Sequence, residues 1–108
     1  MNSRQRRSVA QVDPDFEAEF HSLVEQWKAD TGASSLVQQQ IQHPAYQRII
    51  GMGPQAVPLI LHEMRRRPDH WFWALHAITG EQPVTSGATF GEATEAWLAW
   101  GRTRGLIG

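Results

Sequence analysis

Apolar side chains recur at helical spacing along most of the chain, and turn residues separate the periodic segments. Between Phe16 and Trp27, spacings of one, three and four residues place the apolar side chains on one stripe of an α-helix. Asp13 suits the N-cap of this helix, Pro14 its first turn, and Gly32 its end. We therefore predict an amphipathic helix between Asp13 and Gly32.

Proline and glycine divide the middle of the chain into shorter helices. A helix around Ile41 is expected to end before Pro44, because the residue that precedes a proline avoids the helical region. Apolar spacing then predicts a helix over 44–50 and another that begins at Gly53-Pro54 and is stopped by Pro68. Pro58 lies inside the second of these helices, where it removes one backbone donor, and we expect a bend there.

Two more helices complete the pattern. One is predicted over 70–79, with Asp69 as its cap and Gly80 at its end. The other begins at the capping box TFGE, in which Thr89 and Glu92 satisfy each other's backbone amides. No segment shows the alternating pattern of a strand. The predicted fold class is therefore all-α, with five or six short helices.

Two neighbouring segments resemble parts of a known repeat family. GMGPQAVPLILHEM, residues 51–64, resembles the second helix of a HEAT-like repeat, and PDHWFWALHAITG, residues 68–80, resembles the first helix of the repeat that follows. The resemblance implies that the last four helices form two antiparallel pairs with the N-terminal helix packed across them, and that the protein binds other proteins. The segment from His43 to the C-terminus also resembles small bacterial helical proteins, which implies no activity.

The length of the chain limits its organisation to one domain. A chain of 108 residues buries one modest hydrophobic core. Residues 1–12 lack hydrophobic periodicity, so we predict a flexible N-terminal arm followed by a single helical domain over 13–108. No run of residues is long and apolar enough to span a membrane, and the chain contains no cysteine. We therefore expect a cytoplasmic protein that does not contact membranes.

Three consecutive aromatic residues, Trp71, Phe72 and Trp73, cannot share one face of a helix, because successive residues lie about 100° apart. Helical spacing places Trp71 on the inward stripe, as it does Trp27, Trp97 and Trp100. Phe72 and Trp73 are then either covered by the first helix or available to a partner, which is another protein or a second copy in a homo-oligomer. Since Trp and Arg are enriched where interfaces gain their energy, the candidate partner-binding residues are Phe72, Trp73, Arg65, Arg66 and Arg67.

Basic residues gather in three clusters, although the net charge of the chain is −1. The cluster at 65–67 ends a predicted helix, where positive charge complements the helix dipole. If the three clusters meet in space, they form a patch that suits phosphate groups. An accessory nucleic-acid-binding protein is therefore the alternative function, and the residues outside 65–67 that would carry it are Arg4, Arg6, Arg7, Arg102 and Arg104.

The sequence contains no motif of a catalytic or cofactor site. No two of its five histidines are three or four residues apart, the spacing that puts two metal ligands on one helix face. A small enzyme or metal site built from His62, His70 and His76 is the third hypothesis. We assign no catalytic, cofactor-binding or metal-binding residue, and expect a non-enzymatic adaptor that binds through an exposed surface of aromatic and arginine side chains.

Overall fold

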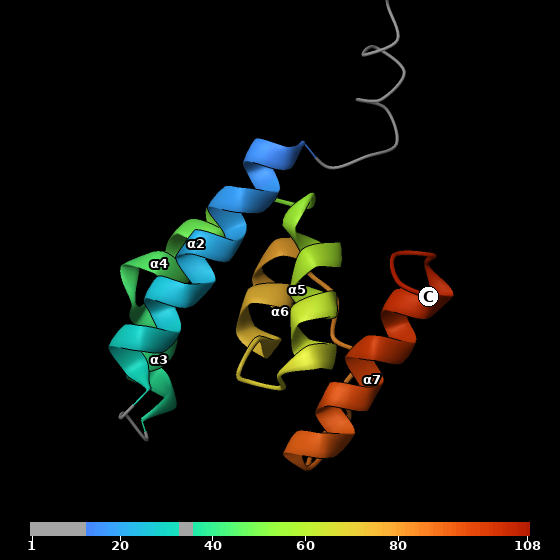
Figure 1. Cartoon of the computed structure of the whole chain (residues 1–108). Helices are drawn as coiled ribbons and strands as arrows, with labels where there is room; N and C mark the ends of the chain where they lie inside the picture. The colour runs from blue at the N-terminus through green and yellow to red at the C-terminus, as the bar shows by residue number, and fades with distance from the viewer. Residues whose placement is uncertain (1–12, 33–35) are drawn as a thin grey trace, which may run out of the picture.

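The helices of the protein begin and end close to their predicted positions. A computed structural model describes residues 13–32 and 36–108, and within these it contains six helices and no strand (Figure 1). The all-α fold class is confirmed, whereas the predicted flexible arm over 1–12 lies outside the described residues. The helices are α2 (Pro14–Thr31), α3 (Val37–Gln42), α4 (Pro44–Gly51), α5 (Ala56–Arg66), α6 (Phe72–Thr79) and α7 (Phe90–Thr103).

Side-chain caps fix the starts of the two longest helices, as predicted. At the start of α2, Asp13 Oδ1 accepts a hydrogen bond of 2.8 Å from the backbone N–H of Asp15, and Pro14 occupies the first turn. At the start of α7, Thr89 Oγ1 accepts from the Glu92 amide at 3.1 Å, while the Thr89 amide donates to Glu92 Oε1 at 2.9 Å. Both helices therefore begin where local sequence satisfies the amides that have no partner within the helix.

Pro58 lies closer to the start of its helix than the sequence suggested. The α-helical part of α5 begins at Ala56, so Pro58 is its third residue. The amides of Ala56 and Val57 donate to the carbonyl oxygens of Gly53 and Pro54, which forms a tight turn before the helix. Amides in the first turn have no partner within the helix, so the missing N–H of Pro58 does not require the bend that the sequence analysis expected.

Alternate helices form the main contacts of the fold. α2 packs on α4, α4 packs on α6, and α5 packs on α7, while α2 also contacts α3 and α5. In Figure 1, α2, α3 and α4 lie on one side, α5 and α6 occupy the middle, and α7 lies on the other side. Of the last four helices, α2 therefore packs mainly on α4 and also on α5, whereas the sequence analysis expected it to pack across both predicted pairs.

Four aromatic side chains form the centre of the core. Phe20, Trp27, Tyr46 and Trp71, which we call the aromatic cluster, are each at most 1% exposed. Trp71 lies between the others, with its ring 4.7 Å from that of Trp27 and 5.7 Å from that of Tyr46, centre to centre. The cluster joins α2, α4 and the residue before α6, and it confirms that Trp27 and Trp71 face inward. Trp97 is buried in α7, and Trp100 is partly buried.

α5 and α7 approach closely at Gly101. This residue is buried in α7, and a Cβ atom added to it would lie only 2.6 Å from Leu61 Cδ1 of α5. Leu61 is fully buried and has little room to move. The absence of a side chain at Gly101 is therefore what permits the contact between the two helices at this point.

We predict that Gly101→Ala destabilises the protein, although alanine favours helix formation. The added methyl group overpacks the contact with Leu61, which costs about 1–3 kcal/mol. Gly91 is the matched control, because it lies in the same helix and a Cβ atom there meets nothing within 4 Å. Gly91→Ala should leave the melting temperature unchanged or raise it. Equal melting temperatures for the two variants would contradict the close approach at Gly101.

Candidate functional site

An apolar groove with a volume of about 350 Å³ lies between α3 and α6. α3 contributes Val37 and Ile41, and α6 contributes Phe72, Trp73 and His76. His70, just before α6, and Gln82, just after it, complete the lining. We call this feature the α3–α6 groove. Its size and apolar lining are typical of surfaces that bind other molecules.

The large hydrophobic side chains that the described residues expose all lie in or beside this groove. They are Leu36, 57% exposed, Val37, 42%, Trp73, 50%, and Phe90, 42%. Val37 and Trp73 line the groove, and Leu36 immediately precedes Val37. The ring of Phe90 lies 5.3 Å from that of Phe72 and 5.2 Å from that of His70, centre to centre. The exposed apolar surface is therefore gathered at one place, as at interaction sites.

The structure decides between the two alternatives for Phe72 and Trp73. Trp71 contacts Phe20 and Trp27 of α2, so the first helix covers Trp71. Trp73 lines the α3–α6 groove and is half exposed, so the alternative in which the first helix buries it is wrong. Phe72 is partly buried against Phe90 of α7. The three consecutive rings thus have three different environments, as their angular separation requires.

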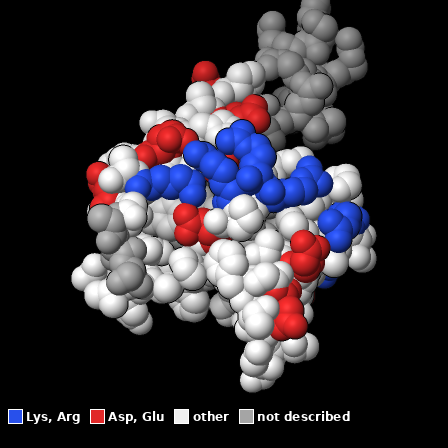
Figure 2. Space-filling view, turned by 60° about the horizontal axis from the view of Figure 1, so that its bottom comes forward, with Lys and Arg blue, Asp and Glu red and all other residues white. Residues whose placement is uncertain are grey.

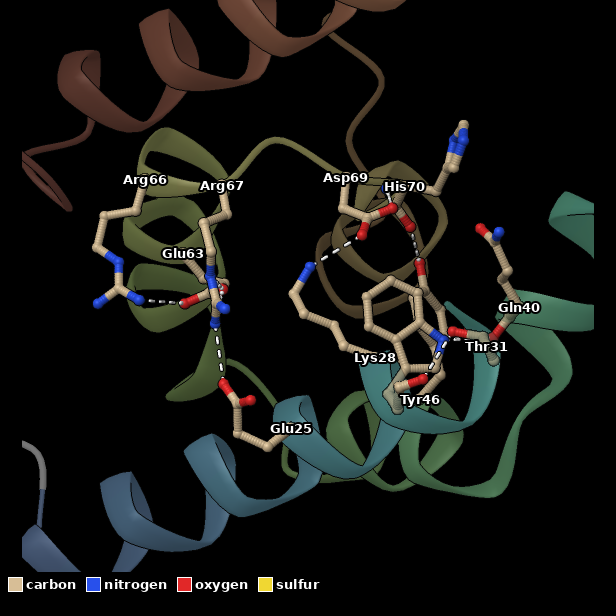
Figure 3. Close-up of polar contacts among 11 residues, drawn as sticks. Glu25, Lys28, Thr31, Gln40, Tyr46, Glu63, Arg66, Arg67, Asp69 and His70 are labelled. Atoms are coloured by element: carbon tan, nitrogen blue, oxygen red, sulfur yellow. Dashed lines mark hydrogen bonds and ion pairs between the residues drawn. The ribbon is translucent and has the colours of Figure 1, made fainter. Parts of the chain in front are cut away.

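Asp69 does not cap α6 in the predicted way. Its Oδ1 accepts from the amide of the adjacent residue His70 at 2.8 Å, and its Oδ2 accepts from Lys28 Nζ of α2 at 2.9 Å (Figure 3). α6 begins two residues later than predicted, at Phe72, and its N-cap residue Trp71 makes no side-chain capping bond. The carboxylate of Asp69 therefore joins the connection before α6 to α2 instead of capping the helix.

Tyr46, a residue of another helix, supplies the missing cap. Its hydroxyl oxygen accepts from the amide of Ala74 at 3.0 Å, and its proton is donated to the carbonyl oxygen of His70 at 2.9 Å. Ala74 is the third residue of α6, and the amide at this position is one that an N-cap side chain normally satisfies. A single buried hydroxyl of α4 therefore sets where α6 begins, and with it the positions of His70 and Trp73 in the groove.

Side chains from two other helices hold the opposite wall. Trp27 Nε1 of α2 donates to the carbonyl oxygen of Gln40 at 2.8 Å, and Gln47 Nε2 of α4 donates to that of Ile41 at 2.7 Å. Both acceptors lie near the end of α3, where carbonyl groups have no partner within the helix. α3 has only six residues, so these bonds are needed to orient Val37 and Ile41. Both walls thus depend on members of the aromatic cluster.

Figure 2 shows a band of Lys and Arg side chains on one face of the molecule, with acidic side chains beside it. Of the three arginines at the end of α5, Arg66 and Arg67 contact a carboxylate. Arg67 Nη2 lies 2.7 Å from Oε2 of Glu63, whose side chain is 1% exposed, and 3.0 Å from Glu25 Oε2 of α2. Arg66 is more distant, 3.8 Å from Glu63. The hydrogen bond from Arg67 and its positive charge hold the pKa of Glu25 below its ordinary value. These contacts tie α5 to α2.

The arginines do not line the α3–α6 groove. In Figure 3, Arg66 and Arg67 lie on one side of the Lys28–Asp69 ion pair, and His70 lies on the other. A partner in the groove would therefore reach the arginines only by extending past this pair. Their predicted place at the rim of a binding surface stays a prediction.

The other candidate basic residues are at the end of α7 or outside the described residues. The guanidinium of Arg104 lies over the ring of Trp100, 4.6 Å from its centre, and 3.7 Å from Glu81. Arg102 is exposed at the end of α7 and forms no ion pair with any described residue. Arg4, Arg6 and Arg7 lie outside the described residues. Arg65 of the 65–67 cluster donates to the carbonyl oxygen of Gly108, just beyond Arg102 and Arg104 in the sequence, at 3.0 Å. A single patch formed by all three basic clusters stays a prediction.

The histidines do not converge on a metal site. His62 Nδ1 lies 3.1 Å from Arg65 Nη2, away from the groove that His70 and His76 line. Across residues 13–32 and 36–108, no three His, Asp or Glu side chains are grouped as metal ligands. The Nδ1 of His76 lies 2.9 Å from the carbonyl oxygen of Glu81, which can only accept, so this nitrogen carries the proton.

The sequence analysis missed the α3 half of the groove. It used Ile41 only as the marker of a short helix, because six residues give too little periodicity to show which side faces outward. The absence of charged residues from two segments of the sequence could have indicated the groove. Residues 31–47 and 70–80 contain no Asp, Glu, Lys or Arg, and these two segments form most of the groove.

Comparisons with known proteins leave the site to be interpreted from its own geometry. The chain matches no protein family model, no curated protein and no solved structure. None of the helices in the described ranges combines the length and the apolar character that crossing a membrane requires.

We predict that Tyr46 resists ionisation for as long as the protein is folded. Burial raises the pKa of its hydroxyl above the ordinary value of about 10. An unfolded chain ionises Tyr46 at about pH 10, so the free energy of unfolding should fall as the pH rises above that value. Tyr46 is the single tyrosine of the chain, so the ultraviolet absorbance of tyrosinate reports this hydroxyl alone.

Tyrosinate absorbance should therefore appear together with the loss of helical circular dichroism, and at higher pH than in the urea-denatured chain. Tyr46→Phe is the control, because it removes the ionising group and should lose less of its neutral-pH stability above about pH 10. Ionisation near pH 10 with the helical signal intact would show that the hydroxyl is accessible to water.

Proposed function

We propose that this chain is a non-catalytic adaptor that binds a protein partner through the α3–α6 groove. The observation that carries the proposal is the gathering of Leu36, Val37, Trp73 and Phe90, the exposed large hydrophobic side chains of the described residues, in and beside one groove. An exposed apolar patch of this kind costs solubility unless a partner covers it. A HEAT-like arrangement of the last four helices, which we propose on their sequence, would agree with a binding role.

Trp73 is the residue we expect to contribute most to binding. It is half exposed, and it stands on a helix whose start is held by the buried hydroxyl of Tyr46. A partner that buries its indole ring gains apolar contact without first having to order the helix. A partner that extends past the Lys28–Asp69 pair would meet Arg65, Arg66 and Arg67, whose charge would set its orientation and its rate of association.

Nucleic-acid binding is the second proposal, and the band of Lys and Arg side chains in Figure 2 favours it. The ion pairs of individual basic side chains weaken the case for nucleic-acid binding. Lys28 is paired with Asp69, and Arg67 with both Glu25 and Glu63, so phosphate groups would have to compete with carboxylates already in place. The groove carries no such competing pair, and we therefore rank protein binding first.

We predict that Trp73→Ala removes partner binding without unfolding the protein. Truncation of a central tryptophan typically costs about 2 kcal/mol or more, which weakens binding roughly thirtyfold. The measurement is a pull-down with the tagged full chain from its native cell, with nuclease treatment, read by mass spectrometry. Arg102→Ala is the control, because Arg102 is exposed and lies outside the groove. Circular dichroism and melting of both variants should match the wild type.

Two results would overturn the proposed function. Partner capture that is equal for Trp73→Ala and for the wild type would exclude the groove as the binding surface. Capture of nuclease-sensitive material alone, weakened steeply by salt and by Arg→Ala changes at 65–67, would support nucleic-acid binding instead.

A further inference from the structure

The two helices that frame the groove carry no charged side chain. α3 has the sequence VQQQIQ and α6 the sequence FWALHAIT, in a chain that contains ten basic and eleven acidic residues. Groove residues outside these helices, His70 and Gln82, add no Asp, Glu, Lys or Arg. A partner selected by opposite charge would need such residues here. The groove therefore suits a partner whose own contact surface is also uncharged.

The polar groups around the groove can pair with identical copies of themselves. Gln38 and Gln42 are exposed on α3, and the exposed Gln82 lines the groove. Gln42 Nε2 donates to Gln38 Oε1 at 3.2 Å, which leaves further amide groups of both side chains for other hydrogen bonds. A side-chain amide both donates and accepts hydrogen bonds, so two glutamines can bond across a two-fold axis. A lysine or glutamate in the same place would meet its own charge and be repelled. This composition favours contact between two identical surfaces.

The size of the groove is also compatible with self-association. The half-exposed ring of Trp73 is part of the lining of a hollow of about 350 Å³, which has room for an indole ring. A two-fold axis brings the same patch of both copies together. The Trp73 ring of each copy can then enter the groove of the other, so the same contact forms twice. The net charge of −1 gives the two copies little overall repulsion.

We propose that the occupant of the α3–α6 groove is a second copy of this chain, in a two-fold dimer in which the Trp73 of each copy enters the groove of the other. This inference rests on the proposed function and specifies its partner. Val37 and Ile41 of one copy then contact the indole of the other, and the glutamines of α3 surround the contact. The arginines at 65–67 stay outside the interface, because they do not line the groove.

The test is the mass of the purified full chain, measured by light scattering and by sedimentation equilibrium over a range of concentrations. Wild type should give twice the chain mass of 12.2 kDa. Two variants should each give 12.2 kDa with an unchanged melting temperature. They are Trp73→Ala, which removes the indole ring, and Val37→Asp, which places a charge in the groove. Arg102→Ala, altered outside the groove, should remain a dimer.

A second measurement locates the interface. The chain has no cysteine, so a Gln38→Cys variant carries one spin label on α3, and any dipolar coupling must come from another copy. Coupling should be present in this variant and lost when Trp73→Ala is added. A label introduced by Gln55→Cys, exposed just before α5, should give a longer distance or none.

Two results overturn the dimer. One is a monomeric wild type at every concentration, and the other is a dimer that survives both Trp73→Ala and Val37→Asp. If the wild type is monomeric and captures another protein only while Trp73 is present, the second copy is excluded and the proposed function stands. If the wild type is monomeric and capture is independent of Trp73, both proposals are contradicted.

Discussion

The hydroxyl of Tyr46 lies between the carbonyl oxygen of His70 and the amide of Ala74, and the start of α6 depends on it. No residue at the N-terminus of α6 caps the helix with its side chain, so α4 provides the cap. The same ring stacks on Trp71, which contacts Trp27, and Trp27 in turn donates to α3 through Gln40. One buried cluster thus places both walls of the surface groove.

The buried aromatic cluster supports the groove, and a different side chain, Trp73, forms its exposed surface. The aromatic cluster is almost fully buried, whereas Trp73, two residues beyond Trp71, is half exposed. The charged groups lie elsewhere, where Arg67 joins α5 to α2 through Glu63 and Glu25. Groove walls that are already ordered by buried contacts would lose little conformational freedom if a molecule bound there, which favours affinity.

Local sequence was enough to predict the parts of the fold that local interactions determine. Asp13 and the capping box at Thr89 satisfy amides within three residues of themselves, so the starts of α2 and α7 followed from pattern alone. The start of α6 did not, because its cap lies 28 residues away in the sequence, at Tyr46. The exposure of Trp73 likewise depends on which ring α2 covers, and tertiary packing decides that. For the same reason the sequence identified the α6 side of the groove but not α3.

The most direct test of this account is amide hydrogen exchange of Ala74, compared between wild type and Tyr46→Phe. The substitution keeps the ring and removes only the hydroxyl, which leaves a buried amide without a partner at a cost of about 1–3 kcal/mol. Exchange at Ala74 should then be faster by roughly tenfold or more, relative to a buried amide of α7 such as that of Trp97. Equal changes at Ala74 and Trp97, or no change at either, would show that the start of α6 does not depend on Tyr46.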